Sequence, residues 1–223
     1  KYDSTRQAFS DTEALPQALL DARDTHWLSA ACALDNRWGL AWLELSTGRF
    51  NLLECADAAQ LRAELQRLRP RELLLPQTLE WPGEAPLRRR PDWHFDRDAA
   101  YRLLCEQFAT RDLRAFGCEQ DGAAVGAAGA LLQYVQDTQK TALPHLTGLR
   151  REHLDDALLL DSATRRNLEL DRTLSGEHDR TLLWLLDQCV TPMGARWLHA
   201  TLLRPLRHAE TLNQRLDAIS ALL

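Results

Sequence analysis

Three short apolar segments separated by two turns are the feature that most constrains the fold of this chain. Each segment has the length of a β-strand, and the turns fall at residues 35–37 and 46–48, the second as Ser-Thr-Gly. Short extended segments joined by tight connections are typical of antiparallel strands that follow one another in a meander. We therefore predict strands over residues 27–34, 38–45 and 49–54.

The hydrophobic period then changes from that of a strand to that of a helix. Leucines at helical spacing share one face of a helix over residues 58–69, which Asp57 is positioned to cap and Pro70 ends. An apolar segment at 72–75 follows, and a strand reached through a crossover helix most simply pairs parallel to a neighbour. This order of elements predicts a ribonuclease-H-like mixed sheet.

The next part of the chain adds helices to that sheet. Residues 76–90 contain prolines and end in three arginines, so we predict a loop there, followed by a further strand at 92–95. Helices are predicted over 97–108 and over 123–137. The second of these is rich in alanine and contains two glycines three residues apart, which would allow another backbone to approach closely.

The C-terminal third has helical start signals. A short strand is predicted at 155–160, and Asp161 follows as the cap of a helix. Thr191 and Pro192 predict the start of another helix. Proline would be its first residue, where a backbone N–H has no hydrogen-bond partner within the helix in any case. We predict that everything after residue 160 is helical and place a domain boundary near residue 150. The predicted fold class is α/β followed by all-α.

The composition excludes several classes of protein. The net charge of -5 gives no overall basic field that would attract nucleic acid. The five cysteines form no C-x-x-C pair, which is typical of a reducing cytosol. No secretory signal opens the chain, and no segment approaches the roughly 20 apolar residues of a membrane helix, so we predict a cytoplasmic protein. The chain starts at Lys1 and ends within an amphipathic pattern, and we expect it to be a piece of a longer protein.

No catalytic or metal-binding constellation emerges from the residues. A G-x-x-x-x-G-K-[ST] phosphate-binding loop is absent, because neither Lys1 nor Lys140 follows a glycine. A ribonuclease-H-like nuclease needs acids clustered on its strands, yet Asp35 lies in a turn and Glu44 is alone in its strand. The seven histidines contain no i,i+4 pair. The alternative is an independent ribonuclease-H-like nuclease with a helical appendage. The placement of the carboxylates distinguishes a nuclease from a non-catalytic protein.

Two sets of arginines leave their role open. The run at 88–90 could contact phosphates or an acidic partner, or could be a solvated run beside a proline-containing loop. Arg165, Arg166 and Arg172 stripe the segment after Asp161. They form either a solvated helix face or a contact with nucleic acid or a partner subunit.

Blocks of sequence spread along the chain resemble the MutS family of DNA mismatch-recognition ATPases. Each block alone is weak, but their order and spacing together are specific. Thr201 departs from the pattern, since family members more often carry tryptophan there. The blocks lie at 46–50, 63–67, 88–91, 108–113, 116–117, 131–134, 137–145, 158–170 and 191–198.

The resemblance implies a division of the chain and of its tasks. Residues 1–18 would be a linker, 19–150 the ribonuclease-H-like connector domain, and 151–223 the start of the helical core or lever domain. The ATPase domain of the family, which binds ATP and Mg²⁺, and the domains that read mismatched DNA would lie outside this chain. The resemblance therefore implies a non-catalytic segment with no cofactor of its own.

The resemblance also implies partners. In such proteins the connector relays the nucleotide state and docks MutL, and the whole protein acts on mismatched DNA as a homodimer or tetramer, without a membrane. From the residues we predict the partner-binding face on the exposed side of the helix at 97–108, because tyrosine and arginine often anchor interfaces. The residues predicted for this face are Arg97, Tyr101, Arg102 and Glu106.

Overall fold

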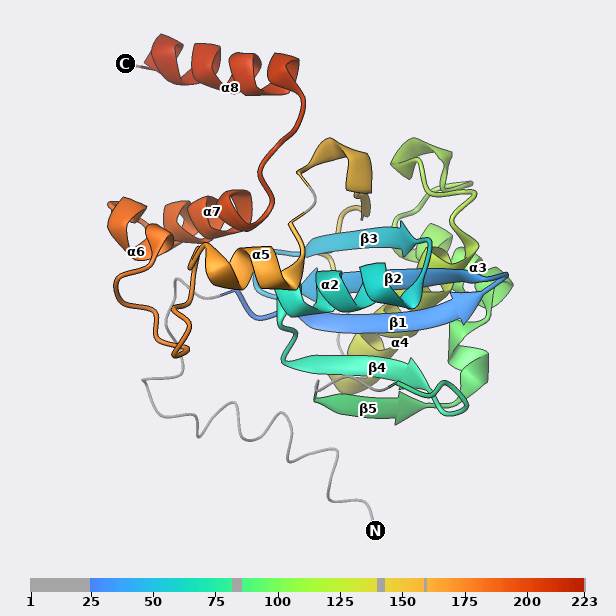
Figure 1. Ribbon diagram of the computed structural model, residues 1–223. Helices are drawn as coiled ribbons and strands as arrows, with labels where there is room; N and C mark the ends of the chain where they lie inside the picture. Colours follow the sequence, from blue (N-terminus) through green and yellow to red (C-terminus); the bar gives the residue numbers. More distant parts are fainter. Residues whose placement is uncertain (1–24, 82–85, 140–142, 159, 223) are drawn as a thin grey trace.

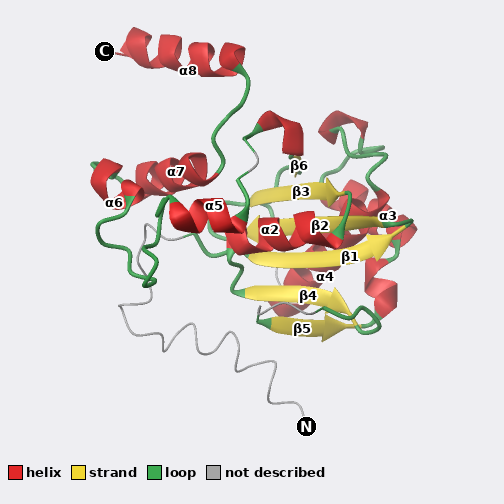
Figure 2. Ribbon diagram, viewed as in Figure 1, coloured by secondary structure: helices red, strands yellow, loops and turns green. Residues whose placement is uncertain are grey.

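The computed structural model describes residues 25–81, 86–139, 143–158 and 160–222. A mixed β-sheet carries helices on both faces, and a helical segment lies beyond one end of the sheet, as Figures 1 and 2 show. The ribonuclease-H-like sheet followed by helices confirms the predicted fold class.

The sheet has six strands in the order β5-β4-β1-β2-β3-β6. Strand β2 is antiparallel to both β1 and β3, β4 is parallel to β1, β5 to β4, and β6 to β3. Both the predicted meander and the predicted parallel fourth strand are confirmed. The strands are β1 (Leu28–Leu34), β2 (Arg37–Glu44), β3 (Arg49–Cys55), β4 (Glu72–Pro76), β5 (Leu87–Arg90) and β6 (Arg150–Arg151).

The turn between β1 and β2 explains why the meander is so tightly connected. Its two residues, Asp35 and Asn36, have φ values of 49° and 58°. Positive φ at both central positions belongs to the two-residue turns whose twist matches that of paired strands, and Asp and Asn tolerate it well. The turn thereby fixes the register in which Leu34 faces Arg37.

Helices cover both faces of the sheet, each over its own apolar layer. Helix α2 (Ala58–Leu68) packs on one face, and α3 (Arg97–Gln107) and α4 (Gly122–Gln139) cover the other. Alternate residues of a strand point to opposite faces. In β2, Leu40 and Trp42 therefore face α2, while Ala41 and Leu43 face α4. Asp57 caps α2 as predicted, its side chain accepting a hydrogen bond from the backbone N–H of Gln60.

Helix α4 lies directly against its neighbours because glycines remove the side chains in between. A Cβ added at Gly39 of β2 would lie 2.0 Å from the carbonyl carbon of Ala123. A Cβ at Gly129 would lie 2.2 Å from Cβ of Ala100 in α3. Both distances are far below any van der Waals contact. The close approach predicted from the small residues of this helix is confirmed.

Two predictions around the edge of the sheet were wrong. Residues 87–90 form edge strand β5 rather than a loop, and the expected strand at 92–95 is a 3-10 turn, η2 (Asp92–Phe95). The arginines of this edge strand have polar partners, so the strand forms without alternating apolar residues. Arg90 pairs with Asp137, and Arg89 donates to the carbonyl of Pro76 at 2.9 Å. The three consecutive arginines at 88–90 therefore belong to a strand although they lack the apolar pattern of one.

The predicted strand at 155–160 was also wrong. The strand of this region is β6, and a 3-10 turn, η4 (Leu154–Asp156), follows it. The backbone N–H of Glu152 still bonds the carbonyl of Leu52 at 2.8 Å, and the chain then leaves the sheet. Ala157 forms an isolated antiparallel bridge with Leu206.

Turns interrupt the helical segment, so the prediction that everything after residue 160 is helical was wrong. Helix α5 is followed by turns over residues 168–181, where Glu169 and Gly176 have positive φ values of 46° and 92° that an α-helix does not permit. The predicted caps are confirmed: Asp161 and Thr191 accept hydrogen bonds from Thr164 and Gly194. The helices are α5 (Ser162–Asn167), α6 (Leu182–Leu186), α7 (Pro192–Leu203) and α8 (Ala209–Leu222).

We predict that Gly39→Ala lowers the free energy of unfolding by about 3 kcal/mol, because the added methyl forces β2 and α4 apart. Gly148→Ala is the matched control, since its Cβ would meet only Cε1 of Phe116, at 3.5 Å. The control should change stability by less than about 0.5 kcal/mol. Urea unfolding measures both variants, and equal stability of the two would show that α4 does not depend on this contact.

Candidate functional site at the junction of the two domains

The helical segment is held to the sheet domain mainly by polar contacts. Its described residues bury few apolar side chains; these are Ala157, Leu170, Ala195 and Leu203. Large side chains such as Trp184 and Met193 are 57% and 72% exposed. The position of the segment therefore depends on directed hydrogen bonds and ion pairs that connect it to the sheet domain.

The first contact starts at the end of α2, where Arg69 has a left-handed backbone with φ 45° and ψ 59°. Its N–H closes the helix by bonding the carbonyl of Leu65 at 2.8 Å. A residue before proline is disfavoured in the right-handed helical region, so Pro70 ends the helix here. The left-handed conformation costs an ordinary side chain about 1–2 kcal/mol. This conformation turns Arg69 toward the helical segment.

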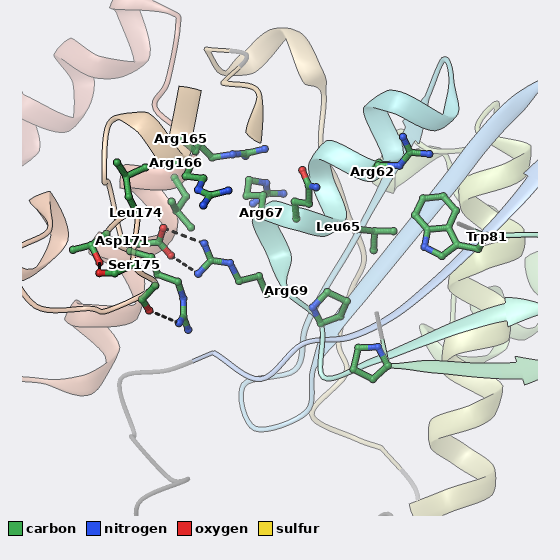
Figure 3. Close-up of a pocket in the computed structure, with 17 residues that line it drawn as sticks. Arg62, Leu65, Arg67, Arg69, Trp81, Arg165, Arg166, Asp171, Leu174 and Ser175 are labelled. Atoms are coloured by element: carbon green, nitrogen blue, oxygen red, sulfur yellow. Dashed lines mark hydrogen bonds and ion pairs between the residues drawn. The ribbon is translucent and has the colours of Figure 1, made fainter. Parts of the chain in front are cut away.

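Arg69 holds Asp171 of the helical segment with both arms of its guanidinium group. Nη1 donates to Oδ2 at 2.7 Å and Nη2 to Oδ1 at 3.2 Å (Figure 3). The side chain of Asp171 is only 5% exposed, and that of Arg69 is 46% exposed. His199 of α7 places Nε2 3.4 Å from Oδ2 of the same carboxylate. One buried carboxylate thus joins α2, the turns after α5, and α7.

The charge of Asp171 is stabilised strongly. Burial by itself raises the pKa of a carboxyl group, but the hydrogen bond with His199 and the positive charge of Arg69 outweigh it and hold the pKa of Asp171 at about 2. The carboxylate therefore stays ionised at any physiological pH, and the contact persists there.

A second contact runs from α5 to α2. Arg165 is buried, and its Nη2 donates to the backbone carbonyl of Ala63 at 2.8 Å. Burial lowers the pKa of Arg165; Glu64 opposes this effect, and the charges of Arg67 and Arg69 add to it. An arginine is thus buried against a helix that carries two further arginines.

A third set of contacts centres on Glu152, directly after β6. Its Oε2 lies 2.7 Å from Nη1 of Arg204, at the end of α7, and 3.5 Å from Nη2 of Arg67. On the neighbouring edge, Arg196 of α7 places Nε 3.8 Å from Oε1 of Glu44. The junction therefore has several ion pairs on separate elements, and these fix the orientation of the two parts.

The described carboxylates do not assemble a nuclease site. Asp35 is exposed in its turn, and buried Glu44 accepts hydrogen bonds from Ser46 and Thr47 in the next turn. Within the described ranges no three His, Cys, Asp or Glu side chains gather where they could hold a metal ion. Burial raises the pKa of the Cys32 and Cys55 thiols to about 12, so both remain protonated and unreactive.

The predicted partner-binding residues lie on α3 with different surroundings. Arg102 and Glu106 are exposed, one helical turn apart. Arg97 is also exposed and donates to the carbonyl of Glu119 at 3.3 Å. Tyr101 is half-buried, and its hydroxyl accepts the backbone N–H of Leu113 at 3.3 Å. The structure therefore gives Tyr101 a role in the fold, and leaves Arg102 and Glu106 open to solvent.

The residues of the junction escaped prediction from sequence. Arg69 and Asp171 are separated by 102 positions, so no local spacing connects them. The sequence shows Arg165, Arg166 and Arg172 at related positions after Asp161, but it does not show that α2 lies against them. The local signal was Pro70, which disfavours right-handed helical backbone at the residue before it but does not predict the left-handed conformation of Arg69.

The ribonuclease-H-like sheet, joined through ion pairs to a helical segment, defines an α/β domain followed by a helical one. Comparison with known protein families identifies it further: residues 27–147 match MutS domain II and residues 163–223 match MutS domain III. The first match alone covers more than half of the 223 residues. The chain belongs to the MutS family, the proteins of DNA mismatch repair.

The matches agree with the architecture. Strands β1 to β5 with α2, α3 and α4 fall within the domain II match, β6 lies just after it, and α6, α7 and α8 fall within the domain III match. Arg69 and Asp171 come from different matched domains, so their contact is an interdomain contact. Among the described helices, none combines the length and apolar character required to span a bilayer.

We predict that Asp171→Asn lowers the free energy of unfolding by about 2 kcal/mol at pH 7, because the pKa of Asp171 falls from 3.8 to about 2 on folding. A depressed pKa stabilises the fold above the unfolded pKa, and this contribution is lost as the pH drops through the folded value. The difference between variant and wild type should therefore shrink between about pH 4 and pH 2.

Asp179→Asn is the control for this prediction, since Asp179 is exposed in the same region of turns. Urea unfolding at several pH values measures the three proteins. The role of Asp171 would be contradicted if the loss of unfolding free energy in the Asp171 variant stayed constant down to pH 2, or if the control lost as much.

Proposed function

We propose that this chain is the non-catalytic connecting part of a MutS protein, and that it transmits the nucleotide state of the protein between domains II and III. The observation that carries the proposal is the junction built around Asp171, where α2 of one domain meets α7 of the other. Packed elements linked by directed ion pairs shift as units between discrete arrangements. Such a junction is suited to passing on a change of orientation.

The proposal places the chemistry of mismatch repair outside these two domains. ATP and Mg²⁺ would be bound, and mismatched bases read, by other domains of the MutS protein, which would act as a homodimer or tetramer. The cytoplasm is the compartment in which such a protein would meet DNA. The chain itself would supply geometry and a surface for a partner protein.

We propose that this partner is MutL and that it docks on α3. Arg102 and Glu106 project from the face of the sheet opposite to α2, and therefore away from the junction. A partner can bind there without disturbing the contact between the two domains. Arg97 at the start of α3 extends this face, and Tyr101 supports it from below by packing against the core.

We predict that Arg102→Glu weakens the binding of MutL to the immobilised chain about tenfold, because a central interface arginine contributes on the order of 1.4 kcal/mol or more. Arg207→Glu is the control: it makes the same charge change at an exposed residue of the helical segment. Biolayer interferometry with purified MutL measures both variants. Unchanged binding by Arg102→Glu, or an equal loss with Arg207→Glu, would move the interface away from α3.

A further inference from the structure

Beside the junction lies a cleft of about 910 Å³, between α2 and the turns after α5. Among the described residues that line it, one carboxylate, that of Asp171, stands against six arginines. This concentration of positive charge contrasts with the net charge of -5 of the chain as a whole. The arginines are Arg62, Arg67, Arg69, Arg165, Arg166 and Arg172.

Within the described residues, two of these arginines form ion pairs with carboxylates. Arg69 is paired with Asp171, and Arg67 with Glu64 at 2.7 Å and with Glu152. The other four form no ion pair with any residue in the described parts of the chain. Arg172 donates only to the carbonyl of Gly176, at 3.1 Å, and Arg165 only to that of Ala63.

The charge of Arg165 is the strongest sign that an anion is expected here. Its side chain is buried, and its only hydrogen bond goes to a neutral carbonyl oxygen. Burying a charge is costly unless an opposite charge accompanies it. Burial has the largest effect on the pKa of Arg165 and lowers it; Glu64 and Asp171 raise the pKa, while Arg67 and Arg69 lower it further. An anion in the cleft would therefore add to the partial compensation that these two carboxylates give.

The cleft has a second, less polar end. Arg67, Arg69, Arg165 and Arg166 reach toward one another from α2 and α5, while Arg62 and Trp81 lie together at the far side (Figure 3). The guanidinium carbon of Arg62 is 5.9 Å from the centre of the Trp81 ring. Leu65, Pro70 and Pro86 line this side as well. Ligand pockets of proteins have volumes of about 300–1,000 Å³, so the cleft has the size for a ligand with several phosphates.

We propose that this cleft is a binding site for phosphate groups, held at the end formed by Arg165, Arg166 and Arg172. Guanidinium groups bind phosphate oxygens in pairs of parallel hydrogen bonds. A phosphate offers three free oxygens and up to two charges, so several arginines can share it, whereas a carboxylate offers two oxygens and one charge. The phosphates come either from a free polyphosphate or nucleotide or from a DNA backbone, and in a nucleotide the base would lie toward Trp81.

Isothermal titration calorimetry of the complete chain tests the proposal with three probes: inorganic tripolyphosphate, ATP and a short duplex DNA. We expect binding of at least one probe, weakened about tenfold or more in Arg166→Glu/Arg172→Glu, because each reversed charge removes a charge-assisted hydrogen bond. Both arginines are exposed, so the double variant should fold, and circular dichroism verifies this. The control Arg111→Glu/Arg150→Glu changes the net charge equally at exposed residues outside the cleft.

The pattern of affinities identifies the source of the phosphates. Binding of tripolyphosphate and ATP assigns the cleft to a free ligand. If ATP binds more tightly than tripolyphosphate and Trp81→Ala removes this difference in affinity, the base lies at the tryptophan. Binding of duplex DNA alone assigns the cleft to a DNA backbone. The proposal is overturned if none of the probes binds, if the control pair weakens binding as much as the cleft pair, or if poly-glutamate binds more tightly than every phosphate probe.

Discussion

The contact between Arg69 and Asp171 is the interaction on which the arrangement of this chain depends. The helical segment buries too few apolar side chains to hold its own position. Its orientation is set by the buried carboxylate of Asp171. Arg69, whose backbone is left-handed, donates two hydrogen bonds to this carboxylate, and His199 of α7 lies beside it. Removing one partner of such a pair leaves a buried charge uncompensated. The contact therefore holds the two domains in one relative orientation.

The parts of the fold that local chemistry determines were predictable. Turn residues such as Asp35 and Asn36 mark the meander, and oxygen-bearing caps such as Asp57 and Asp161 mark helix starts, because each acts within a few residues of its own position. Strand β5 was missed because its arginines bond to groups that only the folded chain brings near. A sequence pattern does not reveal such distant partners.

The candidate site was harder to predict than the fold for the same reason. Its residues come from α2, from the turns after α5 and from α7, and their spacing in sequence carries no signal. The stripe of arginines after Asp161 was visible, but a solvated helix face explained it equally well. Only the position of α2 against α5 shows that Arg165 is buried and that the stripe borders a cleft with unpaired positive charge.

A double-mutant cycle on Arg69 and Asp171 tests the interdomain junction most directly. The free energies of unfolding of Arg69→Gln, Asp171→Asn and the double variant are compared with that of the wild type. We expect a coupling energy of at least about 1 kcal/mol, because either substitution already breaks the contact. Additivity of the two single effects within about 0.5 kcal/mol would show that the residues act independently and that the junction does not depend on this contact.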